Sequence, residues 1–182
     1  AGKPFASVTV YPYQLRQYNN RWFLLCNPVG NDEFPFDPKL IYNYALDRMD
    51  GKVEYVEELP FIDTPVDIDA RFDEIIGVTY REDTPIQDIY FAVKPQSVNY
   101  VLTKFIHPSQ DEVNPETEKE FKTRYPSLKD CKFFFISCRP NLELYALFAS
   151  YRDSVVVVEP TNVRYALVSY LADAVKNYDE LD

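Results

Sequence analysis

Three arginines in the first third of the chain are the residues whose type and setting best fit a chemical role. Arg16, Arg21 and Arg48 each lie in a strand-like segment rich in apolar residues. A guanidinium group binds a phosphate or carboxylate group through two parallel hydrogen bonds. We therefore predict that these three side chains bind an anionic ligand. For Arg48 the alternative is a salt bridge to a nearby carboxylate, such as that of Asp47 or Asp50.

Two tyrosines precede the first of these arginines. Tyr11 and Tyr13 flank Pro12 and are predicted to share one face of a strand. Aromatic rings beside arginines can stack on nucleic-acid bases, at about 1–3 kcal/mol per base. The alternative is ordinary packing in a hydrophobic core, and the sequence leaves both roles open.

Catalytic and metal-binding patterns are not found in the sequence. The chain has one histidine, His107, which precedes Pro108 in a loop-like stretch with no nucleophile beside it. The carboxylates form no HExxH or DxDxD pattern, and 4 glycines are too few for a phosphate-cradling loop. We expect neither an enzyme nor a metal site, and no cofactor.

Composition narrows the class of protein. The 182 residues are 46% hydrophobic, which is enough for a folded core, and the net charge is −10. An acidic chain does not present a chain-wide nucleic-acid surface, so any anion site is local. No apolar run reaches the length of about 18 residues that a transmembrane helix needs. The three cysteines show no metal-like or disulfide-like pairing, which favours a cytoplasmic setting.

The first 66 residues read as a small β-barrel, Sm-like or SH3-like in type. Asn19-Asn20 and Asp50-Gly51 are turn signals, and the segment 27–40 reads as a loop because of its prolines. Four strands are predicted, at 6–17, 21–26, 42–49 and 52–59. The unbroken apolar run at 21–26 predicts a strand covered on both faces, with Trp22, Leu24 and Leu46 in the core. Strand alternation would place Arg48 on the same side as Leu46.

The segment 60–70, with its prolines and aspartates, is predicted to separate domain 1–66 from domain 67–182. In the second domain, segments whose apolar residues follow strand spacing alternate with segments whose apolar residues follow helix spacing. Strands are predicted at 86–94, 131–139 and 154–159, and helical segments at 71–76, 96–106, within 109–127, from Asn141 to Tyr151 and from Thr161 to Tyr178. This order favours a ferredoxin-like α+β domain with an added C-terminal helix.

Three segments in order, YPYQLR (11–16), RWFL (21–24) and LDRM (46–49), resemble the motifs of the WYL domain. Phe23 stands where the family has Tyr, and Met49 stands where it has Ile. The resemblance implies a bacterial transcriptional regulator whose Sm-like barrel senses a ligand, in several members a nucleic acid. It also implies that the second domain is the family's C-terminal extension, which helps the protein to dimerise.

The resemblance therefore predicts the effector-sensing and dimerisation region of a WYL regulator. The expected partners are a second copy of the chain and a single-stranded nucleic acid or nucleotide. Promoter DNA would be bound only through a helix-turn-helix that this sequence lacks, and the first barrel strand of the family is also missing. An edge left open in this way invites pairing with a neighbouring chain. The alternative is a ligand-free module for dimerisation or protein interaction.

Overall fold

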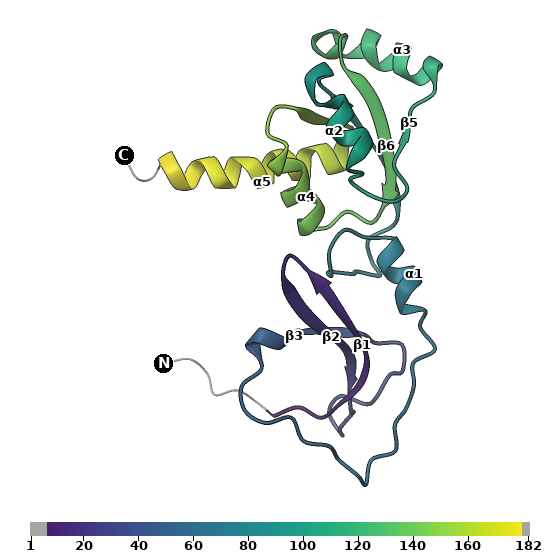
Figure 1. The fold of residues 1–182 in the computed structure, drawn as a ribbon, viewed down its shortest axis with the longest axis vertical. Coiled ribbons are helices and arrows are strands. Elements are labelled where there is room, and N and C mark those ends of the chain that lie inside the picture. The colour runs from purple at the N-terminus through teal and green to yellow at the C-terminus, as the bar shows by residue number, and fades with distance from the viewer. Residues whose placement is uncertain (1–6, 180–182) are drawn as a thin grey trace. The chain divides into compact units, whose positions relative to one another are not determined.

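The computed structural model describes residues 7–179, which form two compact units of mixed α+β structure (Figure 1). The first unit ends at Ile68 and the second begins at Asp69. Each unit contains one antiparallel sheet, and the two sheets have three and four strands. The α+β class predicted from the hydrophobic patterns is confirmed.

The sheet of the first unit has the strand order β1-β2-β3. Its strands are β1 (Val10–Tyr18), β2 (Arg21–Pro28) and β3 (Tyr42–Ala45). Asn19 and Asn20 join β1 to β2 with φ angles of 48° and 61°. Positive φ at both positions is the geometry of a type I′ hairpin turn, which asparagine tolerates. β1 contains an irregularity of the β-bulge kind, because the β1–β2 register shifts between Pro12 and Gln14.

Two expectations for the first unit are wrong. The predicted strand at 52–59 is irregular chain, with Val53 and Tyr55 exposed at 92% and 86%. Alternation alone does not make a strand, because a strand also needs a neighbour to bond and a surface to cover. The predicted strand at 42–49 ends at Ala45, and a 3₁₀ turn, η1 (Leu46–Arg48), follows. Within residues 7–179 the three strands form an open sheet with β1 and β3 at its edges.

The core of the first unit is small, and its buried apolar residues are Tyr11, Leu25, Cys26 and Ala45. The Tyr11 ring meets the rings of Phe36 and Phe61 edge-on, with centroids 5.2 and 6.3 Å away. Asn27 is buried, and its Nδ2 donates a hydrogen bond to the carbonyl of Asp37 at 2.6 Å. The long loop after β2 is therefore bonded back onto the strand that it leaves.

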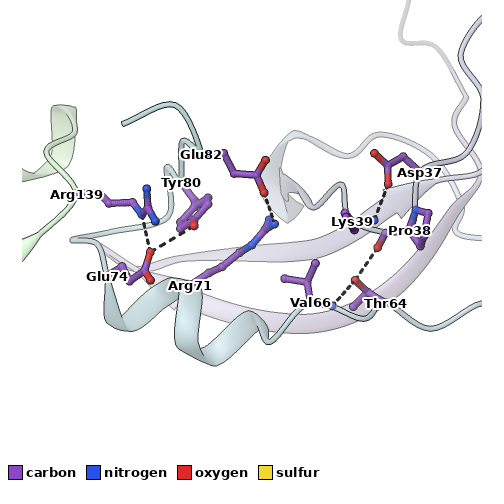
Figure 2. A network of polar contacts seen from close by, with 10 residues as sticks. All are labelled: Asp37, Pro38, Lys39, Thr64, Val66, Arg71, Glu74, Tyr80, Glu82 and Arg139. Carbon is purple, nitrogen blue, oxygen red and sulfur yellow. Dashed lines mark hydrogen bonds and ion pairs between the residues drawn. The ribbon is translucent and has the colours of Figure 1, made fainter. Parts of the chain in front are cut away.

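The segment after η1 is bonded to the same loop. Thr64 Oγ1 donates to the Pro38 carbonyl at 2.8 Å and accepts from the Val66 amide at 3.2 Å (Figure 2). The Asp37 carboxylate accepts from the Lys39 amide at 2.9 Å. These hydrogen bonds, one of them between residues 26 apart in the chain, hold an irregular segment in place without secondary structure.

The sheet of the second unit has the strand order β5-β6-β4-β7, and all pairs are antiparallel. The strands are β4 (Gln87–Val93), β5 (Asp111–Glu112), β6 (Lys132–Cys138) and β7 (Val155–Glu159). The predictions for β4, β6 and β7 are confirmed to within one or two residues at each end.

Five α-helices and two 3₁₀ turns accompany this sheet: α1 (Ile68–Asp73), η2 (Pro95–Ser97), α2 (Val98–Thr103), α3 (Pro115–Arg124), η3 (Pro126–Leu128), α4 (Leu142–Ser150) and α5 (Thr161–Asp179). Asparagine side chains cap two of them. Asn114 Oδ1 accepts from the Thr117 amide, and Asn141 Oδ1 accepts from the Leu144 amide, each at 2.9 Å. Such bonds satisfy amides that have no partner within the helix.

Apolar side chains cover both faces of this sheet. One cluster joins Phe91 and Ile136 of the sheet to Val101, Leu144 and Val163, which lie on α2, α4 and α5. A second cluster lies on the other face of the sheet. Its buried members include Ala92, Phe133 and Val158 of the strands and Phe121 of α3. The sheet is therefore packed on both sides, as its apolar strands predict.

An arginine at the end of β6 anchors the segment that follows α1. Arg139 Nε donates to Glu74 Oε2 at 2.5 Å, and its amide donates to the Glu74 carbonyl at 2.6 Å (Figure 2). The guanidinium groups of Arg139 and Arg71 lie 5.0 and 4.8 Å from the centre of the Tyr80 ring. Arg71 also pairs with Glu82 at 2.7 Å. Cation–π contacts and partly buried ion pairs thus join residues 71–82 to the sheet.

Candidate anion-binding site

The β1–β2 hairpin places two of the predicted arginines on one face. Arg16 pairs with Phe23, and Tyr18 pairs with Arg21. Directly opposed residues share a face, so Arg16, Tyr18, Arg21 and Phe23 all lie on the same side of the sheet. Arg16 and Arg21 are diagonal neighbours across the two strands, and residues related in this way lie about 7–8 Å apart. We call these four residues, with Asp47 and Arg48, the hairpin patch.

Arg21 is oriented by an ion pair. Its Nη2 and Nε lie 2.7 and 3.0 Å from Oδ2 of Asp47 in η1. The hydrogen bond from Arg21 holds the pKa of the Asp47 carboxyl below its usual range. Both side chains are largely exposed, and ion pairs of this kind add little stability. An incoming anion can therefore exchange with Asp47 at small cost to the fold.

Arg48 reaches the hairpin patch through η1 and not through a strand. A 3₁₀ turn advances about 120° per residue, so Arg48 and Leu46 do not share a side as strand alternation had predicted. Arg48 is exposed and follows Asp47 directly in the chain. Its charge contributes to the lowered pKa of Asp47, as the charge of Arg21 does. Asp47, one of the carboxylates considered as a salt-bridge partner for Arg48, pairs with Arg21.

The two predicted tyrosines lie away from this patch. Tyr11 is buried in the core, and Tyr13 packs edge-on against Phe61 with centroids 6.1 Å apart. Burial raises the pKa of Tyr13. Five residues of strand separate Tyr11 from Arg16, or about 17 Å at the strand rise. The structure thus places Arg16 and Arg21 on one face of the hairpin and Arg48 in η1, beside the Asp47 that Arg21 contacts, and it leaves Tyr11 and Tyr13 at the other end of β1.

The aromatic residues that do accompany the arginines are Tyr18 and Phe23, both partly buried. Sequence reasoning missed them, although a signal was available. An Asn-Asn turn of two residues makes Tyr18 face Arg21 and Arg16 face Phe23, so the register follows from the turn alone.

Trp22 lies on the opposite face and is not a core residue. Its side chain is 49% exposed and pairs with the polar Gln17. Leu15, Leu24 and Tyr44 form the next row across the sheet, and Leu15 is also exposed. The prediction of a covered strand holds only near Cys26, which is fully buried. Leu24 is partly buried and Leu46 is exposed, so the core assignment of these residues is also corrected.

The chemistry available at the hairpin patch is anion recognition. The Arg21 guanidinium contacts the Asp47 carboxylate, the Arg48 charge acts on the same carboxylate, and Arg16 shares the sheet face of Arg21, in a chain whose net charge is −10. Guanidinium groups bind phosphate oxygens in pairs of hydrogen bonds, and Tyr18 and Phe23 supply ring surface beside them. Across residues 7–179, no group of three or more His, Cys, Asp or Glu side chains is arranged to hold a metal ion.

No protein-family model matches the sequence, and no curated protein matches it. Among solved structures, it is similar to the proteasome accessory factor B/C (PafBC) of Arthrobacter aurescens, with a TM-score of 0.34 and 16% sequence identity. The match covers 87% of this chain and 21% of the other, and likeness of this degree does not define a family. None of the helices within residues 7–179 has the length and apolar character to cross a membrane.

Proposed function

We propose that the hairpin patch binds an anionic effector, a single-stranded nucleic acid or a nucleotide. The observation that supports this proposal is that the segments carrying Arg16, Arg21 and Arg48 meet at one end of the sheet, where Arg21 contacts Asp47. Tyr18 and Phe23 lie on the same face as two of them. Arginines interleaved with aromatic rings suit a ligand that has both phosphates and bases.

The chain then acts as the effector-sensing and dimerisation region of a WYL-type transcriptional regulator. The support is the motif set YPYQLR, RWFL and LDRM, whose arginines all lie in the hairpin patch. Effector binding would change the arrangement of a homodimer, and promoter DNA would be bound by a helix-turn-helix outside this sequence. The proposal assigns no catalytic role to the chain.

The same proposal assigns a fold to each of the two units. The β4-α2-β5-β6-α4-β7 succession and the strand order β5-β6-β4-β7 support a ferredoxin-like arrangement for the second unit, with α3 as an insertion before β6. The β1-β2-β3 meander supports an Sm-like barrel for the first unit, which would need further strands to close.

Substitution of the three arginines tests the proposal. The variant Arg16→Ala, Arg21→Ala, Arg48→Ala should lose binding of a labelled single-stranded oligonucleotide, measured by fluorescence anisotropy. Arg81→Ala is the matched control, because Arg81 is an exposed arginine of the second unit. Equal affinity in the triple variant and the control would refute the proposal. Circular dichroism spectra would show that all variants are folded.

A second candidate function is an assembly module that binds no small ligand. The observation in its favour is the set of exposed apolar side chains on α5, among them Val168, Val175 and Tyr178. Aromatic residues are enriched at protein interfaces. Light scattering separates the two functions, since a constitutive dimer that no oligonucleotide alters would favour assembly alone.

A further inference from the structure

The second half of α5 carries an apolar stripe that no residue of the second unit up to Asp179 covers. Val163 and Leu167, in the first half, are buried in the core cluster. Every residue from 168 to 179 is exposed. In Figure 1 this half of the yellow helix extends past α4 and the rest of the second unit. The α5 stripe consists of Val168, Leu171, Val175 and Tyr178, exposed at 55%, 42%, 57% and 74%.

The spacing of the α5 stripe is that of a coiled coil. Its members follow one another at intervals of three, four and three residues. A period of 3.5 residues keeps one narrow line of side chains facing a partner helix. Ala172 and Ala174 flank the line, and such small side chains let two helices approach closely. No charged residue lies on the line between Val168 and Tyr178.

We infer that the α5 stripe packs against the same stripe of a second copy of this chain, with the two helices antiparallel. A two-fold axis near Asp173 would pair Leu171 of each copy with Val175 of the other, and Val168 with Tyr178. A self-complementary surface of this kind is what a two-fold dimer requires. The inference rests on the homodimer of the proposed function and names the surface that pairs, but it does not depend on the effector site. Loss of oligonucleotide binding in the arginine variants would therefore leave it standing.

Charge favours the antiparallel direction. In that arrangement Asp179 of each copy lies within about one helical turn of Arg164 of the other. A parallel pair would instead place the two Asp179 carboxylates at the same end and align the two helix dipoles. The first half of each α5 is already ordered by packing on its own core, so association orders little new helix.

The expected dimer is weak, because the stripe spans only about two heptads. Sedimentation velocity of the 182-residue chain should show an average mass that rises with protein concentration. Val175→Glu should raise the dissociation constant about tenfold or more. Ser169→Glu is the matched control, since it adds the same charge to the same helix outside the stripe, and it should leave the dissociation constant within about twofold.

Cysteine cross-linking tests the direction. The double variant Leu171→Cys, Val175→Cys should form a covalent dimer on oxidation, and Val175→Cys alone should not. The native cysteines are buried, and burial raises the pKa of Cys26 and of Cys138 to about 12, which keeps these two thiols unreactive. A mass that stays monomeric at every concentration would overturn the inference, as would equal effects of Val175→Glu and Ser169→Glu. Efficient cross-linking by Val175→Cys alone would overturn the antiparallel direction.

Discussion

Arg21 and Asp47 form an ion pair, with 2.7 Å between Nη2 and Oδ2, that joins the start of β2 to the turn after β3. The pair links two of the three WYL-like motifs, because Arg21 belongs to RWFL and Asp47 to LDRM. It also brings Arg48 to the end of the sheet where Arg16 lies. The proposed effector site therefore depends on a contact between residues that are far apart in the chain.

Asp47→Asn should strengthen the binding of an anionic oligonucleotide, by about three- to tenfold. The substitution removes the negative charge that competes with the ligand for Arg21 and keeps the size of the side chain. Fluorescence anisotropy of a labelled oligonucleotide measures the change. Asp130→Asn, an exposed aspartate of the second unit, removes the same charge far along the chain and should have little effect. Weaker binding in Asp47→Asn would mean that Asp47 orients Arg21 and does not compete with the ligand.

Trp22→Ala should lower the free energy of unfolding by less than about 1 kcal/mol, because the side chain is half exposed. Leu25→Ala, in the same strand but at a buried position, should cost about 2–5 kcal/mol. Urea denaturation followed by circular dichroism compares the two variants. An equally large loss of unfolding free energy in Trp22→Ala and Leu25→Ala would show that Trp22 is a core residue.

Two leucines of α4 give a matched test of the second unit. Leu144 is fully buried in the core cluster, and Leu142 is 67% exposed. Leu144→Ala should destabilise the second unit by about 2–5 kcal/mol through the lost burial and the cavity left behind. Leu142→Ala removes the same atoms from the surface and should change the free energy of unfolding by about 0.5 kcal/mol or less. Similar losses in urea denaturation would contradict the orientation of α4.

His107 should make stability depend on pH. The ring is buried, and its Nδ1 lies 2.7 Å from Ser109 Oγ and accepts from the Ser109 amide at 3.2 Å. Ser109 Oγ accepts in turn from the Ser137 amide at 2.8 Å. Burial lowers the pKa of His107 below its ordinary 6.5, and the Asp73 carbonyl and charge oppose this only in part.

The direction of the pH effect follows from that shift. Below pH 6.5 the unfolded chain binds a proton that the folded chain does not, so unfolding becomes more favourable as the pH falls. The contribution of His107 to the free energy of unfolding is complete above pH 6.5, and it is lost as the pH falls toward the pKa of His107 in the folded chain. His107→Gln should remove this slope from free energies of unfolding measured between about pH 5 and pH 7.5. An unchanged slope in that variant would assign the effect to other groups.

The helices and strands that could be predicted from the sequence are those whose apolar residues follow a single pattern over the whole length of the element. β6, an apolar run with buried residues on both faces, and α5, whose apolar residues recur at helix spacing, are examples. The segment 52–59 has the strand period too, but its side chains find no partner strand, and periodicity contains no information about partners. η1 was missed for a related reason, since three residues are too few to show a period.

The candidate site was predicted in part for the same reason. Residue type identified the arginines, but their neighbours depend on strand register. The register of the hairpin could be read from its Asn-Asn turn, which places Tyr18 and Phe23 beside Arg16 and Arg21. The bond between Arg21 and Asp47 depends on how β3 ends, and no local pattern in the sequence specifies that.

The most direct test of the effector site is a titration of the intact chain with single-stranded DNA, single-stranded RNA and mononucleotides, followed by Trp22 fluorescence. Trp22 is the chain's one tryptophan and adjoins Arg21, so its emission reports on the hairpin. The account predicts saturable binding that weakens with salt, with a slope of log K against log salt of about −2 for three phosphate contacts on a single strand. Arg21→Ala and Arg48→Ala should each make that slope shallower. Because Trp22 lies on the face opposite the hairpin patch, fluorescence anisotropy of labelled ligands accompanies the titration. No binding by either readout, or binding indifferent to both salt and these arginines, would contradict the account.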